Sequence, residues 1–414
     1  MGKWLLLSAV VGVCCGVLGS AFHIGVELAT GYRLAHRWVI FTLPLIGAVC
    51  VWIYRLFRVE GQGTNNILRE VQTGEGLSPA LVPAIFLATV LTHLAGGSAG
   101  REGAALQMGG TIGYWAGRLL RLDDRDLRTA TMVGMAAFFS ALFGTPLAAS
   151  VFAFGVVSVG TIYHAAFVPC FTAALGAYGV SLLLGVEPTR FAVAVPAMDA
   201  ALLLRVAVLA VLGAFLSVLF CAVLHTSEKA AERYCKNPWL RAVLGGGALL
   251  ALTLLLGTSD YNGAGMGVIA AAVEQGRAVP TAFLWKMLFT ALTLSVGFKG
   301  GEVVPSFFVG AAFGCVVGPL LDLLAGFAAA VGLVSVFCGA VNCPISSIFL
   351  AVELFGAEGL LAWALCCGIS FVLSGYSGLY SSQRILYDKL KAHYIDVHTN
   401  AHHQGERTES GERQ

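Results

Sequence analysis

A charged pair, Arg101 and Glu102, lies among glycines and alanines in the segment GSAGREGAALQM, residues 97–108, although only 12% of the chain is charged. A helix N-terminus exposes unpaired backbone N–H groups and carries about half a positive charge, and glycine lets an anion approach those groups closely. We therefore predict an anion site that the ionised Glu102 closes, and that the protonated Glu102 leaves while it carries a proton. The alternative is a structural Arg101–Glu102 pair at a helix end, although adjacent helical residues do not face each other.

The same pattern, G-x-x-G-x-E, returns 200 residues later (302 − 102) in the segment GFKGGEVVPSFFVGA, which begins at Gly297. In this second copy Glu302 lies three residues after Lys299. Two interpretations of Glu302 stay open: an ion pair with Lys299 across the turn, or a role in proton transport.

Two further motif pairs keep nearly the same spacing. GQG at 61–63 corresponds to GAG at 263–265 with an offset of 202, and Pro146 corresponds to Pro344 with an offset of 198. These pairs predict a duplicated chain whose halves are related by a pseudo-twofold axis. They also predict broken helices whose ends meet inside a membrane, where irregular backbone is tolerated only if it is buried or lines a polar cavity. The alternative is that the glycines only allow close helix packing.

The composition indicates a membrane protein. The chain is 57% hydrophobic, its mean hydropathy is +0.81, and soluble domains are typically about 25% charged. Apolar runs at 43–54, 201–224 and 242–257 are continuous rather than alternating, which is typical of helices that span or enter a bilayer. We expect an all-α polytopic membrane protein with a first transmembrane repeat at 1–190, a second at 191–387, and a polar tail at 388–414 that is cytoplasmic and disordered. Basic residues in 118–128 and after Arg384 favour the cytoplasmic side, so both termini are expected there.

Other residue types limit the function. The net charge of +2 does not indicate a nucleic-acid partner, and eleven cysteines without CxxC spacing indicate no metal or cofactor. Glu353 is predicted to be a hydrogen-bonded carboxylate, and His23 and Glu27 are predicted to pair locally. A Tyr380 hydroxyl at membrane depth needs a partner and can donate to an anion, with interfacial anchoring as the alternative.

At these motifs the sequence resembles the CLC chloride channels and transporters. GREGA at 100–104 resembles their GREGP or GKEGP motif, and GQG at 61–63 resembles the start of their GSGIP. GGEVVP at 300–305 resembles GGxFxP, and Tyr380 in GLYSSQ matches their pore tyrosine. The resemblance covers about residues 1 to 390 and implies a CLC-like inverted-repeat fold with broken and re-entrant helices in a homodimer.

The resemblance also implies roles for individual residues. Glu102 is expected to be the gating glutamate, and the amides of Val303 and Val304 with the Tyr380 hydroxyl are expected to line the central anion site. The same anion path is expected to include Gly61, Gln62, Gly63, Thr64, Arg101 and Gly103. The implied partners are a small inorganic anion, protons, membrane lipid and a second copy of the chain, without cofactor, metal or nucleic acid.

Departures from the chloride-transporting pattern favour fluoride. Ala104 replaces the usual proline, Gln62 replaces the serine that binds chloride, and the inner proton glutamate of the exchangers is replaced by Gly155 or Val156. These changes resemble the fluoride-exporting bacterial branch, whose motifs look like GREGT, GxGxN and GGEVTP, although Val304 stands where that branch usually has threonine. The expected function is a fluoride/proton antiporter of the bacterial inner membrane.

Two alternative functions stay open beside fluoride/proton exchange. The first is a chloride channel or chloride/proton exchanger of the same fold. The remote second is an intramembrane enzyme, which would need a nucleophile and a base; His93 is the only deep candidate. We therefore expect no enzyme.

Overall fold

The computed structural model describes residues 2–161, 163–391 and 393–400, and sixteen α-helices lie in this part of the chain. The first eight are α1 (Gly2–Ala35), α2 (Leu43–Leu56), α3 (Thr64–Thr73), α4 (Leu81–Ala95), α5 (Glu102–Leu119), α6 (Asp124–Phe143), α7 (Pro146–Gly155) and α8 (His164–Leu183). The other eight are α9 (Ala200–Tyr234), α10 (Pro238–Leu256), α11 (Met266–Glu274), α12 (Ala282–Ser295), α13 (Val303–Val317), α14 (Ala325–Val341), α15 (Pro344–Phe355) and α16 (Leu360–Leu373). Three short 3₁₀ helices accompany them: η1 (Arg37–Thr42), η2 (Gly318–Leu321) and η3 (Ala357–Gly359).

The paired sequence motifs begin equivalent helices. Gly63 precedes α3 and Gly265 precedes α11, while Pro146 opens α7 and Pro344 opens α15. Glycine and proline set these starts locally, because glycine permits unusual backbone angles and proline suits the first turn. The boundary expected at residue 190 falls in the segment between α8 and α9.

The helices divide between spanning lengths and shorter lengths. Six helical segments in the described part of the chain are long and apolar enough to cross a membrane: 2–35, 37–56, 164–183, 200–234, 238–256 and 303–321. A crossing needs about 20 residues, so the shorter apolar helices such as α4, α7 and α15 are too short to cross a membrane alone. The predicted polytopic helical fold is confirmed.

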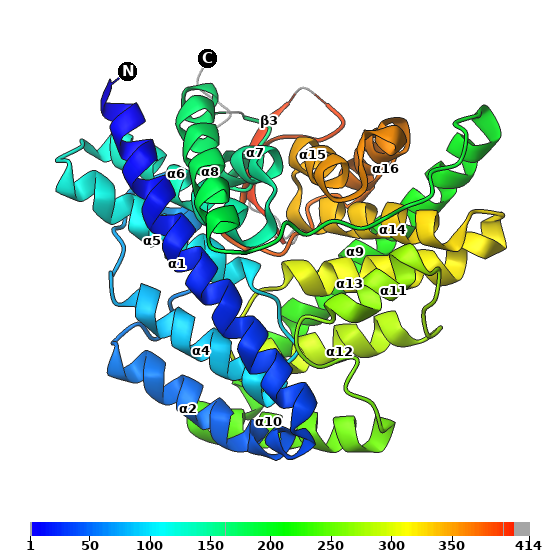
Figure 1. The fold of residues 1–414 in the computed structure, drawn as a ribbon, viewed down its shortest axis with the longest axis horizontal. Helices are drawn as coiled ribbons and strands as arrows, with labels where there is room; N and C mark the ends of the chain where they lie inside the picture. Colours follow the sequence, from blue (N-terminus) through cyan, green and yellow to red (C-terminus); the bar gives the residue numbers. More distant parts are fainter. Residues whose placement is uncertain (1, 162, 392, 401–414) are drawn as a thin grey trace, which may run out of the picture.

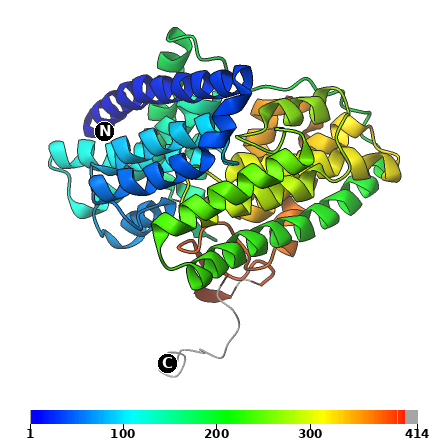
Figure 2. The same ribbon diagram turned by 90° about the horizontal axis from the view of Figure 1, so that it is seen from below.

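The two halves of the chain form two sides of the molecule. In Figure 1, α1, α2, α4 and α5 lie on one side, and α11 to α14 lie on the other. Figure 2 shows the same division from below, with blue and cyan helices facing green and yellow ones. Helices of opposite halves also contact each other, because α2 packs on α10 and α7 packs on α15.

Glycines away from the motifs permit close helix packing. A Cβ at Gly134 on α6 would lie 1.9 Å from the Gly109 carbonyl oxygen on α5. In the second half, a Cβ at Gly314 on α13 would lie 2.1 Å from the Ala328 carbonyl oxygen on α14. For these glycines the packing interpretation is the right one.

A small sheet at the end of the chain corrects the prediction of a disordered tail from residue 388. Strand β2 (Arg384–Tyr387) pairs in parallel with β1 (Ser158–Val159) and antiparallel with β3 (Tyr394–His398). In β3 the apolar Ile395 and Val397 alternate with Asp396 and His398, but an alternation over only five residues was too short to stand out in a polar segment. Residues 401–414 of the expected tail lie outside the described residues.

Candidate anion site

The two copies of the glycine–glutamate motif meet in space. The Gly100 amide donates to the Gly301 carbonyl at 2.7 Å, and the Gly301 amide donates to the Gly100 carbonyl at 2.9 Å. A Cβ at Gly301 would lie 2.5 Å from the Gly103 nitrogen, so only glycine allows this approach. The contact brings the N-termini of α5 and α13 together, although they come from opposite halves of the chain.

Glu102 is fully buried at this junction. Its Oε1 accepts a hydrogen bond from the Arg101 amide at 3.0 Å, and its Oε2 accepts one from the Val304 amide at 3.2 Å. The carboxylate of the first half therefore lies on a backbone donor in the first turn of α13. An anion at the same place would find the same N–H group and the same helix dipole.

Arg101 points away from the glutamate beside it. Its Nη1 lies 2.9 Å from His23 Nδ1, and His23 Nε2 lies 2.9 Å from the Glu27 carboxylate. Because an arginine only donates, His23 must accept at Nδ1 and donate from Nε2 to Glu27. The predicted local pair of His23 and Glu27 is confirmed, and no ion pair joins Arg101 to Glu102 among the described residues.

Lys299 and Glu302 do not form the ion pair that was one of their two interpretations, as far as the described residues go. The Lys299 ammonium lies 4.3 Å from the ring centroid of Tyr54, an arrangement in which the ring face attracts the cation. Glu302 precedes α13 and lines a cavity. The structural interpretation of this pair is therefore wrong.

Tyr380 is almost completely buried, and its hydroxyl has no hydrogen-bond partner among the described residues. A buried hydroxyl without a partner is unfavourable by about 1 to 3 kcal/mol, so this position favours a polar ligand. Tyr380 lines a cavity of about 370 Å³. The predicted residues that share this wall are Gly61, Gln62, Gly63, Thr64, Lys299 and Glu302.

The remaining predicted residues do not line that cavity. Val303 and Val304 are buried in the first turn of α13, and Gly103 packs against Gly300 and Gly301. Arg101 lines a different cavity of about 1040 Å³, together with Arg33 and His93. Of the predicted residues, Arg101 alone lines this second cavity, and neither cavity is lined by Glu102, Gly103, Val303 or Val304. The buried Glu102 accepts hydrogen bonds from the Arg101 and Val304 amides.

Two further charged side chains, Glu353 and Lys286, bond to backbone groups. The Glu353 carboxylate accepts from the Leu147 and Ala148 amides at 3.0 and 2.9 Å, which confirms its predicted hydrogen bonding. Lys286, which the sequence reasoning missed, is fully buried and donates to the Gly263 and Tyr261 carbonyls at 2.6 and 3.2 Å. A single lysine in the apolar segment AFLWKMLFTAL was the available signal.

A duplicated helical membrane protein in which two helix N-termini converge on one buried carboxylate belongs, by fold and site, to the class of anion-transport proteins. Residues 46–375 match the family described as "Voltage gated chloride channel". This chain belongs to that family, which is the CLC family that its motifs resemble.

Individual relatives agree over most of the chain. A protein called "Chloride/fluoride channel protein" from Pseudomonas syringae pv. tomato is 35% identical over 94% of this chain and 88% of its own length. An H(+)/Cl(-) exchange transporter from Vibrio vulnificus is 24% identical over 84% of this chain and 81% of its own length.

Solved structures share the fold. The crystal structure of a CLC-type fluoride/proton antiporter superposes with a TM-score of 0.89 at 33% identity and covers 92% of this chain and 98% of that one. A slow cyanobacterial Cl-/H+ antiporter superposes with a TM-score of 0.79 at 19% identity, over 90% of this chain and 94% of that one. The second comparison bears on the fold alone.

Proposed function

We propose that this protein is a fluoride/proton antiporter that exports fluoride across the bacterial inner membrane, with Glu102 as gate and proton carrier. The observation that carries the proposal is the hydrogen bond from the Val304 amide to the Glu102 carboxylate. The similarity to a fluoride/proton antiporter at 33% identity supports fluoride as the anion.

Competition for one set of donors explains the exchange. When Glu102 is ionised, its carboxylate occupies the Val304 amide and an anion cannot bind there. Protonation removes the negative charge, so the carboxyl group loses its attraction to the α13 N-terminus and leaves the amide to an anion. An anion therefore takes the Val304 amide only when Glu102 has taken up a proton. In this proposal the proton and the fluoride reach the site from opposite sides of the membrane, so that proton entry is coupled to fluoride exit.

Neutral hydrogen-bond donors suit the transport of fluoride better than a fully charged lysine or arginine side chain does. Fluoride is small and strongly hydrated, so several short hydrogen bonds must replace its water. The Val304 amide and the unpartnered Tyr380 hydroxyl are two such donors in this proposal. Dipoles and neutral donors hold the ion less tightly than a buried lysine or arginine would, which lets the ion leave.

We assign the inner step of the proton path to Glu302. It lines the cavity that Tyr380 also lines, and Lys299, three residues before it, is turned toward Tyr54. A carboxylate in this place can pass a proton from Glu102 toward the water-filled side. Gly155 and Val156 at the end of α7 offer no carboxylate for that purpose.

In this proposal the protein crosses the inner membrane several times and has both termini in the cytoplasm. It forms a homodimer with one pore in each subunit. Exposed apolar side chains on α8, among them Phe167, Val168 and Leu175, suit lipid or a second copy of the chain. The protein is a transporter and not an enzyme in this account. It uses no cofactor.

The second candidate is a channel or exchanger for chloride, and the name of the Pseudomonas syringae relative favours it. Purified protein in liposomes loaded with fluoride or with chloride would separate the two. An anion electrode and a pH electrode would record together. Fluoride efflux with stoichiometric proton uptake, and chloride efflux at least about tenfold slower, is the expected result. Equal rates for both anions, or efflux without proton movement, would support the second candidate.

A further inference from the structure

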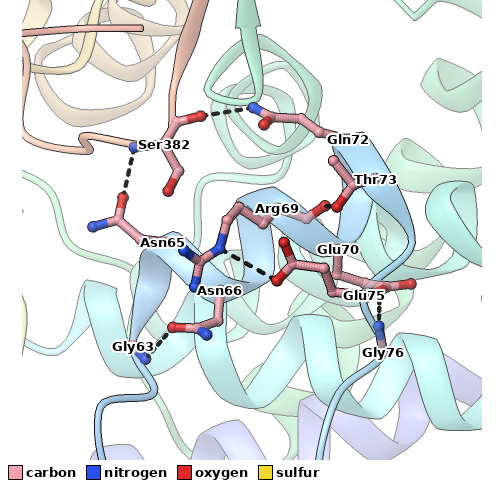
Figure 3. A network of polar contacts seen from close by, with 10 residues as sticks. All are labelled: Gly63, Asn65, Asn66, Arg69, Glu70, Gln72, Thr73, Glu75, Gly76 and Ser382. Carbon is pink, nitrogen blue, oxygen red and sulfur yellow. Dashed lines mark hydrogen bonds and ion pairs between the residues drawn. The ribbon is translucent and has the colours of Figure 1, made fainter. Parts of the chain in front are cut away.

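Helix α3 connects two walls of the cavity that Tyr380 lines: the wall formed by residues 61–64 and the wall that contains Tyr380. It begins at Thr64, directly after the GQG motif, and two of its side chains reach the segment that follows Tyr380. Asn65 Oδ1 accepts from the Ser382 amide at 3.0 Å, and Gln72 Nε2 donates to the Ser382 carbonyl at 2.8 Å. Figure 3 shows both side chains directed at this one residue.

The amide and the carbonyl of Ser382 bond to the side chains of Asn65 and Gln72. Ser382 lies between Tyr380 and strand β2, outside any helix or strand, and buried backbone groups need partners. Gln72 Nε2 also donates to the Val157 carbonyl at 2.9 Å, so one amide group joins Ser382 to the segment after α7. Gln383 Nε2 adds bonds to the Val156 and Val341 carbonyls at 3.0 and 2.9 Å.

Tyr380 is tied to this held segment. Its carbonyl accepts from the Gln383 amide at 2.9 Å and from Thr399 Oγ1 at 2.5 Å. These bonds hold residues 380–383 as one turn, so the position of Ser382 affects the position of the Tyr380 side chain. The ring carries the hydroxyl that lacks a partner among the described residues.

Helix α3 itself is braced at both ends, as Figure 3 also shows. The Gly63 amide donates to Asn66 Oδ1 at 3.0 Å at its start. Beyond its end, Arg69 pairs with Glu75 at 3.3 Å and the Gly76 amide donates to Glu70. A ten-residue helix fixed in this way can act as a spacer between the GQG wall and the Tyr380 wall.

We propose that Asn65 and Gln72 are positioning residues for anion binding: they hold the Tyr380 hydroxyl at a fixed distance from the wall formed by residues 61–64. The inference rests on the proposed role of Tyr380 as an anion donor. Because fluoride is smaller than chloride, its binding depends more on short donor distances, so a loosened Tyr380 weakens fluoride binding more than chloride binding.

The test compares variants that remove one hydrogen-bonding atom each. Asn65→Leu removes the acceptor, and Gln72→Glu keeps the shape but replaces the donor with an oxygen that repels two carbonyls. Thr73→Ala is the matched control, because Thr73 is exposed on the same helix and its hydroxyl, within the described part of the chain, bonds only to the Arg69 carbonyl. Each variant is made in wild type and in Tyr380→Phe, and initial rates in proteoliposomes are measured against fluoride and chloride concentration.

We expect Asn65→Leu and Gln72→Glu each to raise the half-saturating fluoride concentration about fivefold, the effect of losing about one hydrogen bond, with a smaller change for chloride. Thr73→Ala should stay within about twofold. In the Tyr380→Phe background the added effect of each substitution should also stay within about twofold, because residues that act through a shared group are not additive.

Two results would overturn the inference, and they differ in meaning. If Tyr380→Phe raises the half-saturating fluoride concentration but the α3 substitutions add their full effect to it, then α3 does not act through Tyr380, while the proposed anion site stands. If Tyr380→Phe leaves fluoride transport unchanged, the proposed role of Tyr380 fails and the positioning role fails with it.

Discussion

At the scale of single residues, the orientation of Arg101 bears on the proposed movement of Glu102. Arg101 is buried, and its guanidinium is bonded to His23 rather than to the glutamate beside it. A buried charge without a partner is costly, so the guanidinium needs the His23 acceptor to stay where it is. The Glu27–His23 pair thus holds the guanidinium away from the carboxylate to which we assign the proton.

This arrangement makes a prediction for His23. His23→Leu removes the acceptor, and the released guanidinium should pair with Glu102 and lower the fluoride transport rate about tenfold, an effect of about 1.4 kcal/mol. His23→Gln keeps an acceptor for Arg101 and should retain most of the rate. Proteoliposome efflux of the two variants checks this, and equal rates in both would show that the bond to His23 does not matter for the gate.

At the scale of elements, small residues decide how closely helices pack. The Gly314 position on α13 leaves no room for a side chain, because its Cβ would meet the Ala328 backbone. We predict that Gly314→Ala pushes α13 from α14 and destabilises the protein by about 1 to 3 kcal/mol, as other overpacked sites do. The matched control is Gly176→Ala on α8, where a Cβ would meet nothing within 4 Å.

Thermal unfolding in detergent measures the two glycine variants side by side. Gly314→Ala should unfold at a clearly lower temperature than wild type, and Gly176→Ala should unfold with wild type or slightly above it. A Gly314→Ala protein as stable as the control would mean that α13 and α14 tolerate a wider separation.

The small sheet carries a pH-dependent contact outside the spanning helices. Arg384 donates to the Asp396 carboxylate between β2 and β3, with Nε and Oδ1 2.9 Å apart. This bond lowers the pKa of Asp396 below its ordinary value of 3.8. A lowered pKa in the folded state adds stability above the ordinary value, and that stability is lost as the pH falls through the folded pKa.

We therefore expect the β2–β3 pairing to lose stability progressively as the pH falls below about 4, and to be loosest below the lowered pKa of Asp396, where the folded carboxylate takes up a proton. Limited proteolysis with an acid-stable protease across this range would detect the loosening as faster cleavage near 388–398. Asp396→Asn should be cleaved faster at neutral pH and should show little further change in acid. Cleavage of wild type that does not depend on pH would contradict the expected effect of this ion pair.

At the scale of the whole molecule, duplication is what completes the site. Glu102 comes from the first half and the Val304 amide from the second, and the Gly100–Gly301 contact joins them. The motif spacing predicted that broken helices of the two halves meet, because glycine and proline act on the backbone locally and mark helix starts wherever the chain later folds. The roles of Val304 and Tyr380 were implied by the resemblance to the CLC family. The repeat, the helical fold and the residues around Glu102 and Tyr380 could therefore be predicted from the sequence.

Contacts between distant side chains could not be predicted in the same way. Lys299 was placed beside Glu302 by sequence distance, yet it lies over Tyr54, which is 245 residues away (299 − 54). Arg101 and His23 are separated by 78 residues in the sequence. Ser382 and Asn65 of α3, which share a hydrogen bond, are separated by 317 residues. Each of these contacts forms because a buried charge or backbone group needs a partner. Which partner is within reach depends on the folded structure and not on the distance in the sequence.

The central claim is that one carboxylate alternates between binding a proton and blocking the anion. The most direct test is proton uptake during fluoride efflux from proteoliposomes, compared between wild type and Glu102→Gln, which keeps the shape but cannot ionise. We predict that wild type takes up protons as fluoride leaves and drives fluoride against its gradient when a pH gradient is imposed, and that Glu102→Gln moves no protons. Proton uptake that persists in Glu102→Gln would contradict the account, because another group would then carry the proton.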